Sequence, residues 1–357
     1  MNVLSSYSHL SSVVLTKLEE YKNDIYSNIL KNIGMFIKYI FRGRTFFTAQ
    51  GPTSTSLCYN KHMNVQQALK FGIENLKKAK IKDANREALI LLKELIGNKI
   101  TDYKYEIPSG TLKKYTEWIK RRSNHEPVAY ITGHKEFFGL NFTVNKNVLI
   151  PRPETETLVE ECLKLLGTPY FLLHTSSIID MGTGSGCIAV SIARNIQKRL
   201  PAIRLNSPSK SGRQVEIVGI DTSQKALRIA KENTKKNKVT IKFIKNNLLK
   251  NIKLKKPTII VANLPYVRRT ELKTLQPEIK NYEPSKALDG GKDGLDIYRK
   301  LFKQLSKQKN LIVLLIEIDP RQKNGIKKMT KKYLPEFSIT FQKDLASRLR
   351  VAILSRS

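Results

Sequence analysis

The sequence has few of the residues that build disulfide or metal-bound frameworks. Its 357 residues include only three cysteines, Cys58, Cys162 and Cys187, and five dispersed histidines. A disulfide scaffold needs a denser set of cysteines, and a structural zinc site needs closely spaced Cys or His ligands. The sequence therefore predicts a reducing compartment and a mechanism without a metal ion.

Long apolar runs are also missing. A helix that crosses a bilayer needs about 20 consecutive apolar residues. The longest apolar candidate here, residues 311–318, has the length of a buried strand. The sequence therefore predicts no membrane span, and we expect a monomeric protein of the cytoplasm.

Acidic residues are scarce relative to basic ones. The chain has 64 Lys and Arg against 30 Asp and Glu, which gives a formal net charge of +34. Such a charge attracts polyanions nonspecifically and favours contact with RNA or the ribosome. The lysines are scattered along the whole chain, however, which is equally typical of a general lysine bias with solvated faces. Both interpretations stay open.

The length predicts more than one domain, because single cores stop growing below this size. Residues 1–62 form an extension that combines Ser-rich stretches with a basic aromatic segment, and we expect it to be disordered or a targeting segment. Glu19, Glu20 and Asp24 are atypical of an organellar targeting sequence, which favours a dispensable extension before a second start at Met63. An organellar location is the alternative if the extension does direct targeting.

Residues 63–127 are predicted to form a small helical bundle. Apolar residues recur there at helical spacing, as in Ala68, Phe71 and Leu76. Residues 128–150 contain Gly133 and Gly139 and alternate more like short strands, which predicts a β-hairpin linker.

Residues 151–357 alternate between apolar strand patterns and helical patterns. Alternation of this kind predicts a mostly parallel sheet covered on both faces, an α/β fold. Seven strands whose last two lack an intervening helix are typical of class I methyltransferases, which have a Rossmann-like fold. Residues 200–213 are predicted to form a surface insertion before the second strand. The expected strands cover residues 177–180, 215–221, 240–244, 258–262, 311–318, 338–342 and 350–354.

A glycine-rich loop, Asp180–Gly186 (DMGTGSG), lies directly between a predicted strand and a predicted helix. Glycine lets the backbone approach a ligand closely and turn into a helix N-terminus, although a tight turn without a ligand needs glycine as well. The third glycine comes one residue too early for a pyrophosphate-binding loop, so S-adenosyl-L-methionine fits better than a dinucleotide. The predicted cofactor-binding residues of this loop are Gly182, Thr183, Gly184, Ser185 and Gly186.

Two further segments are candidates for cofactor binding. Asp221 closes a predicted strand, where an acidic group can accept both ribose hydroxyls, or alternatively cap the helix that follows. After the next strand, Asn246 and Asn247 are candidates to bond the adenine amino group, and Leu248 to pack on its ring.

The motif that indicates the chemistry is Asn263-Leu264-Pro265-Tyr266, which follows an apolar strand. A planar amide or aromatic amine is a poor nucleophile, because its lone pair is delocalised. The Asn263 side-chain oxygen and the Leu264 carbonyl would each accept one N–H and orient the nitrogen, and Tyr266 would form an aromatic wall. Asn263, Pro265 and Tyr266 are therefore the predicted catalytic residues, all four bind substrate, and Asn263 also contacts the cofactor. A plain strand-ending turn is the alternative.

With these motifs in place, residues 63–357 resemble the protein-(glutamine-N(5)) methyltransferases of the PrmC/HemK family. The distinctive segments are Leu149–Glu156 (LIPRPETE), the glycine loop, the Asn263 motif and Tyr282–Leu295 (YEPSKALDGGKDGL). The resemblance implies methyl transfer from S-adenosyl-L-methionine to the glutamine of the Gly-Gly-Gln motif in peptide chain release factors, and thus a role in translation termination. It also implies that the helical bundle of residues 63–127 recognises the substrate.

Two residues depart from the family pattern. Leu264 replaces the first proline of the usual Asn-Pro-Pro-Tyr, which keeps the carbonyl acceptor but loses the fixed φ. Asn247 stands where an acidic residue is common. The resemblance also suggests that Arg152 and Glu154 shape the cleft for the release-factor loop, whereas a linker held by salt bridges is the alternative.

The competing function is adenine-N(6) methylation of RNA or DNA. The Asn-Leu-Pro-Tyr motif also suits that chemistry, and the net charge of +34 suits nucleic acid. A noncatalytic RNA-binding protein that keeps the fold is a further alternative.

Overall fold

A computed structural model describes residues 62–199, 203–205 and 213–356. The predicted extension therefore lies outside the described residues, except for His62. Among the described helices, none is both long and apolar enough to traverse a bilayer.

The first described elements are three helices: α2 (Val65–Lys78), α3 (Ala84–Ile96) and α4 (Ser109–Ser123). Asn64 begins α2 with a capping box, since its side chain accepts from the Gln67 amide and the Gln67 side chain accepts from the Asn64 amide. Gly72 of α2 lies against Tyr115 of α4, since a Cβ built on Gly72 would lie 2.1 Å from the Tyr115 hydroxyl. These two helices are therefore closely packed. This region has the helical bundle that its apolar spacing predicts.

Short elements connect the bundle to the sheet. They are η1 (Gly97–Thr101), α5 (Val128–Thr132) and the antiparallel strands β1 (His134–Phe137) and β2 (Leu140–Thr143). Phe138 and Gly139 form the turn with φ of +52° and +69°, so the hairpin is closed by two residues in the left-handed region.

The remaining strands form one mixed sheet in the order β4-β5-β3-β7-β8-β10-β9, and β6 pairs with β5. β10 runs antiparallel between β8 and β9, and the other pairings are parallel. All seven predicted strands are present, but part of the predicted insertion forms the additional short strand β4. The strands are β3 (Ser177–Met181), β4 (Ile203–Leu205), β5 (Arg213–Asp221), β6 (Lys242–Lys245), β7 (Thr258–Ala262), β8 (Leu311–Glu317), β9 (Phe337–Lys343) and β10 (Leu349–Arg356).

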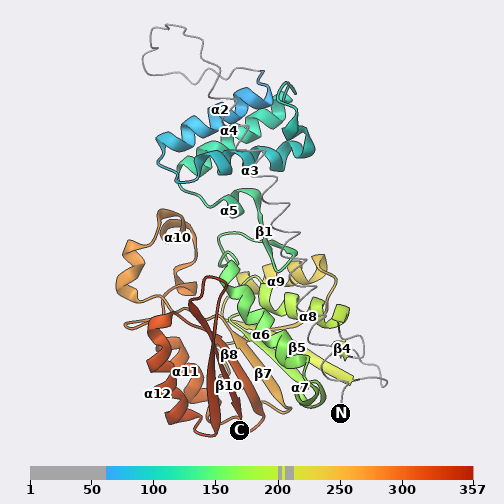
Figure 1. The fold of residues 1–357 in the computed structure, drawn as a ribbon, viewed down its shortest axis with the longest axis vertical. Helices are drawn as coiled ribbons and strands as arrows, with labels where there is room; N and C mark the ends of the chain where they lie inside the picture. The colour runs from blue at the N-terminus through green and yellow to red at the C-terminus, as the bar shows by residue number, and fades with distance from the viewer. Residues whose placement is uncertain (1–61, 200–202, 206–212, 357) are drawn as a thin grey trace. The chain divides into compact units, whose positions relative to one another are not determined.

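Helices cover both faces of this sheet (Figure 1). Successive residues of a buried strand point to opposite faces. In β7, Ile259 therefore packs with α6 and α8, whereas Ile260 packs with α11 and α12. The helices are α6 (Glu156–Leu166), α7 (Pro169–His174), α8 (Cys187–Arg199), α9 (Gln224–Lys236), α10 (Pro277–Tyr282), α11 (Asp296–Leu305) and α12 (Lys323–Tyr333). Short 3-10 turns are η2 (Pro153–Thr155), η3 (Arg269–Thr274), η4 (Ser285–Ala287) and η5 (Pro320–Gln322).

Candidate active site

The register of the parallel strands brings the predicted motifs to one edge of the sheet. Met181 of β3 pairs with Ile220 of β5 on one side and with Ala262 of β7 on the other, and Ala262 also pairs with Ile316 of β8. The residues that follow these four positions are Gly182, Asp221, Asn263 and Glu317. Ligand crevices of open α/β sheets lie at this carboxyl edge.

The glycine loop needs its glycines for two separate reasons. Gly182, Gly184 and Gly186 have φ of +76°, +54° and +81°, a region that other residues rarely adopt. A Cβ on Gly182 would lie 2.9 Å from the Leu264 side chain, so the loop packs directly against the Asn263 motif. A Cβ on Gly184 would meet nothing closer than 3.9 Å, which leaves open space on that side of the loop for a ligand.

Asp180, the first residue of the loop motif, is completely buried. Its Oδ2 accepts hydrogen bonds from the Thr183 hydroxyl at 2.7 Å and from the Ala189 amide at 3.1 Å. Its Oδ1 is buried without a hydrogen-bond partner among the described residues. Burial raises the pKa of this carboxyl to about 7, although both hydrogen bonds oppose the shift.

Asp221 fixes the glycine loop from the neighbouring strand. Its Oδ2 accepts from the Gly184 amide at 3.0 Å, and its Oδ1 accepts from the Ser223 amide at 2.7 Å. Burial raises the pKa of Asp221. The N-cap of α9 is Ser223, whose hydroxyl accepts from the Ala226 amide, so Asp221 does not cap that helix. Ribose binding by Asp221 stays a prediction.

The segment after β6 has a compact local structure. The Asn246 side chain donates to the carbonyls of Leu248 and Lys250 at 3.0 and 2.9 Å. Leu248 is buried in the same apolar core as Ile220, whereas Asn247 is exposed. Asn246 therefore closes a turn, and contacts of Asn247 and Leu248 with adenine stay predictions.

In the Asn263 motif, the side chains point inward to fixed partners. The Asn263 Nδ2 donates to the Thr155 Oγ1 at 3.0 Å, and the Tyr266 hydroxyl donates to the Glu317 Oε1 at 2.9 Å. The Leu264 side chain is buried, and its amide donates to the Tyr298 hydroxyl at 3.4 Å. Leucine in place of proline thus leaves an N–H that needs an acceptor, and α11 supplies it.

Two acceptors of the motif remain open. Among the described residues, no group donates to the Asn263 side-chain oxygen or to the Leu264 carbonyl. Asn263 lines a surface pocket together with the glycine loop and with Leu149–Arg152. Pro265 and Tyr266 are half-buried beside it. The full lining is Leu149, Ile150, Pro151, Arg152, Thr155, Gly182, Thr183, Gly184, Ser185, Cys187, Ile188 and Asn263.

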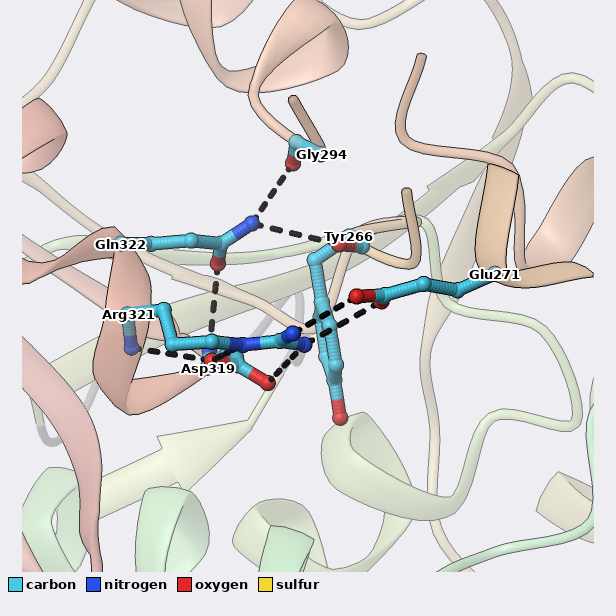
Figure 2. A network of polar contacts seen from close by, with 6 residues as sticks. All are labelled: Tyr266, Glu271, Gly294, Asp319, Arg321 and Gln322. Carbon is cyan, nitrogen blue, oxygen red and sulfur yellow. Dashed lines mark hydrogen bonds and ion pairs between the residues drawn. The ribbon is translucent and has the colours of Figure 1, made fainter. Parts of the chain in front are cut away.

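A buried glutamine holds the backbone at Tyr266, the last residue of the Asn263 motif. The Gln322 Nε2 donates to the carbonyls of Tyr266 at 3.2 Å and Gly294 at 2.8 Å, and its Oε1 accepts from the Asp319 amide at 3.1 Å (Figure 2). Beside it, the exposed Arg321 forms an ion pair with Glu271 at 2.6 Å (Figure 2). η5 therefore fixes the backbone at the point where the motif ends.

Sequence reasoning missed three of these residues, Thr155, Glu317 and Gln322. Glu317 had a detectable signal, because it is a lone charge inside an otherwise apolar strand, and such a residue needs a buried partner. Thr155 lies in the LIPRPETE segment, but its residue type and spacing give no sign of its contact with Asn263. Gln322 had no local signal, because its partners are backbone carbonyls far away in the sequence.

The LIPRPETE segment is tied to the Tyr282–Leu295 segment. Arg152 forms an ion pair with Glu283, whose other oxygen accepts from the Ile150 amide at 3.2 Å. A salt bridge of the kind expected for a linker is therefore present. Arg152 also lines the pocket, as expected for a residue that shapes a cleft. Glu154 is exposed, and its role toward a release factor stays a prediction.

No group of three or more His, Cys, Asp or Glu side chains in the described ranges is placed to hold a metal ion. The glycine loop and the Asn263 motif, packed together at the carboxyl edge of a mixed sheet, define a class I methyltransferase of Rossmann-like fold.

Comparison with known proteins identifies the family within that class. Residues 67–133 match the PrmC N-terminal domain, and residues 174–346 match a methyltransferase domain. The release factor glutamine methyltransferase of Thermodesulfovibrio yellowstonii is 37% identical over 256 residues, which cover 71% of this chain and 84% of that protein. The enzyme of the same name from Clostridium acetobutylicum is 35% identical, covering 72% and 85%. The chain belongs to the release factor glutamine methyltransferase family.

Among solved structures, the release-factor-specific protein-(glutamine-N5) methyltransferase of Alicyclobacillus acidocaldarius is 24% identical. The match covers 60% of this chain and 99% of that protein with a TM-score of 0.33. Membership of the family therefore rests on the sequence matches.

The methyl donor of this enzyme class is S-adenosyl-L-methionine, and the residues present fit it. The open side of Gly184 gives room for a ligand, and the unpartnered, buried Asp180 Oδ1 is a polar atom beneath the loop. The bound donor supplies an activated methyl group on a sulfonium. The residues expected to hold it are those of the glycine loop, with Asp221 beside them.

Proposed function

We propose that this protein methylates the side-chain amide nitrogen of the glutamine in the Gly-Gly-Gln motif of a peptide chain release factor. The observation that carries the proposal is the pair of open acceptors, the Asn263 side-chain oxygen and the Leu264 carbonyl. A primary amide has two N–H groups, so two acceptors hold it in a fixed plane. The names of the relatives add the substrate.

The protein's contribution to the reaction is mainly orientation. When two acceptors take the N–H groups, charge that develops on the nitrogen during transfer is stabilised, and the lone pair faces the donor methyl. The half-buried Tyr266 ring forms the wall beside that position. Glu317 is buried and already accepts from Tyr266, so it serves the site as a structural group. The methyl group leaves the sulfonium, which becomes a neutral thioether, and the nitrogen then releases one proton to water.

A methyl-transfer assay tests the proposal. Purified release factor and stripped ribosomal RNA are each incubated with the protein and a donor that carries a labelled methyl group. We expect label on the release factor and none on the RNA. Label on the RNA alone would contradict the proposal and would support adenine-N(6) methylation.

We further propose that the basic surface makes weak, nonspecific contact with RNA near the ribosome, and that the enzyme acts as a monomer in the cytoplasm. The support for the RNA contact is the net charge of +34. Because lysines are scattered along the chain, such contact would raise the local concentration of ribosomal partners without selecting a sequence.

A further inference from the structure

A buried asparagine of α9, Asn233, lies behind the glycine loop. Its side chain is completely buried. The Asn233 Nδ2 donates to the Ser185 carbonyl of the loop at 2.8 Å and to the Thr143 carbonyl of β2 at 3.0 Å. The Asn233 Oδ1 accepts from the Thr143 amide at 2.7 Å. One side chain therefore joins α9, the hairpin and the glycine loop, which are far apart in the sequence.

The three partners fix the orientation of the Asn233 amide. A side-chain amide has one oxygen that accepts and an NH2 group with two hydrogens to donate. The surroundings offer one backbone N–H and two backbone carbonyls, so each group of the amide has a partner. An aspartate has the same shape but could not donate to either carbonyl. Among side chains of this shape, only asparagine pairs with all three backbone groups.

The contact with Asn233 holds the last peptide group of the glycine loop. The carbonyl of this group belongs to Ser185 and accepts from Asn233. Its N–H belongs to Gly186 and donates to the Thr183 carbonyl at 2.7 Å. Ala230, about one turn before Asn233 on α9, packs against the same point, since a Cβ built on Gly186 would lie 3.1 Å from the Ala230 Cβ. α9 therefore supports the loop where it leads into α8.

The backbone of Ser185 also has a free donor. Ser185 lines the pocket, and among the described residues no group accepts from its amide. An unpaired N–H just before a helix N-terminus is suited to an acceptor atom of a bound ligand. The direction of this N–H depends on the backbone of Ser185, which Asn233 holds through the carbonyl of the same residue.

We propose that Asn233 is a positioning residue for S-adenosyl-L-methionine, which holds the glycine loop in its binding conformation before the methyl donor is bound. A loop that is already ordered loses less conformational freedom on binding, and this raises the affinity for the ligand. Asn233 forms no hydrogen bond with the Asn263 motif in the described residues, so its effect falls on donor binding and not on the transfer step. The proposal is independent of which nitrogen receives the methyl group.

Calorimetry of the full chain with S-adenosyl-L-methionine is the first test. Asn233→Ala removes all three contacts, whereas Asn233→Asp keeps the acceptor for the Thr143 amide and loses both donations. We expect the Kd to rise at least about tenfold in each variant. Asn237→Ala is the matched control, because Asn237 lies one turn further along α9 and contacts the hairpin at Asn141 but not the loop. Its Kd should change less than about twofold.

Urea unfolding of each variant shows whether it is folded under the conditions of the calorimetry. A folded Asn233 variant with the wild-type Kd would overturn the proposal, and so would an equal loss of affinity in Asn237→Ala. With release factor as substrate, kcat at saturating donor should fall less than about threefold, and a loss confined to kcat would also overturn it. Donor binding as expected, with release factor left unmethylated, would contradict only the proposed function.

Amide hydrogen exchange of the full chain without ligand is the second test. In the wild type we expect the Gly186 amide to exchange as slowly as the amides in the middle of α9, because the loop and the helix open together. In Asn233→Asp the Gly186 amide should exchange faster, while the amides of α9 keep their rates. Fast exchange at Gly186 in the wild type would show that the loop is not held before the donor binds. That result would overturn the proposal even if no Asn233 variant folds.

Discussion

Leu264 and Asn263 offer different kinds of hydrogen-bond acceptor: a backbone carbonyl and a side-chain oxygen. The Leu264 side chain is buried against the glycine loop, and its carbonyl has no donor among the described residues. Asn263 instead offers a side-chain oxygen. A leucine is compatible with the usual proline position because the acceptor is a backbone atom, and Tyr298 satisfies the additional N–H.

Asn263→Ala should abolish turnover, because it removes one of the two acceptors that hold the substrate nitrogen. Affinity for S-adenosyl-L-methionine should stay within about tenfold, or about 1.4 kcal/mol. Single-turnover kinetics and calorimetry measure the two quantities. Asn98→Ala, an exposed position on η1, is the matched control and should leave both unchanged. Near-normal turnover in Asn263→Ala would exclude this residue from the mechanism.

Asp180 should make stability depend on pH in the absence of ligand. Burial raises its folded-state pKa from 3.8 to about 7, so the folded chain keeps a proton that the unfolded chain has already released. Stability should therefore fall as pH rises from about 4 to about 7, by at most about 1.4 kcal/mol per pH unit. Asp221, the neighbouring charge, contributes to this shift.

Urea unfolding between pH 5 and pH 8 checks this dependence. Asp180→Asn keeps an oxygen for Thr183 and Ala189 and has no titrating group, so its stability should vary less with pH than that of the wild type. Parallel pH profiles for the two proteins would show that Asp180 is ionised in the fold throughout this range.

At the residue scale, the sequence was most informative where chemistry fixes the residue type. The glycine loop and the Asn263 motif could be located because few residue types suit a close approach or a pair of acceptors. Their arrangement at one edge follows from strand order. The hydrogen bond from the Asn263 amide to Thr155 could not be predicted, because the two residues are far apart in the sequence and become neighbours only in the fold.

At the scale of elements, the end of β8 supports the whole Asn263 motif. Glu317 holds the Tyr266 hydroxyl, and Gln322 holds the Tyr266 carbonyl. The motif is thus held at the side chain and at the backbone by one strand end and the turn that follows it. The apolar pattern predicted β8, but not this supporting role, because Tyr266 follows a different strand and is far from Glu317 and Gln322 in the sequence.

Gln322→Leu tests the backbone brace. The change leaves the carbonyls of Tyr266 and Gly294 without their donor, and unpaired buried groups cost about 1–3 kcal/mol. We expect lower stability in urea unfolding and a lower kcat. Arg321→Ala is the matched control in the same turn, because exposed ion pairs contribute only about 0–1 kcal/mol. Equal losses in both variants would contradict a specific role for Gln322.

The strand β4 shows where local patterns fail. Residues 200–213 contain two prolines and three serines, which predicts a surface insertion, yet residues 203–205 pair with the start of β5. A three-residue strand leaves almost no periodic signal, and its pairing is decided by the neighbouring edge.

At the scale of the whole molecule, the charge of +34 is the most unusual property. Nonspecific RNA binding should weaken steeply with salt, because each neutralised phosphate releases counterions. Fluorescence anisotropy with a labelled RNA of arbitrary sequence, titrated at several salt concentrations, measures this slope. Binding that is tight and insensitive to salt would contradict a purely electrostatic contact and would point to a specific RNA site.

The domain boundaries at residues 62, 127 and 150 and the location in the cytoplasm stay predictions. The helical region, the hairpin and the mixed sheet follow in the order that the sequence predicts. The extension lies outside the described residues, so its targeting or dispensable role is a matter for truncation experiments.

The most direct test of the central claim is mass spectrometry of the release factor's Gly-Gly-Gln peptide, purified with and without this protein and its methyl donor. A peptide heavier by one methyl group, with the fragment ions placing it on the glutamine side chain, is the result we expect. An unmodified glutamine under conditions where the donor is consumed would contradict it.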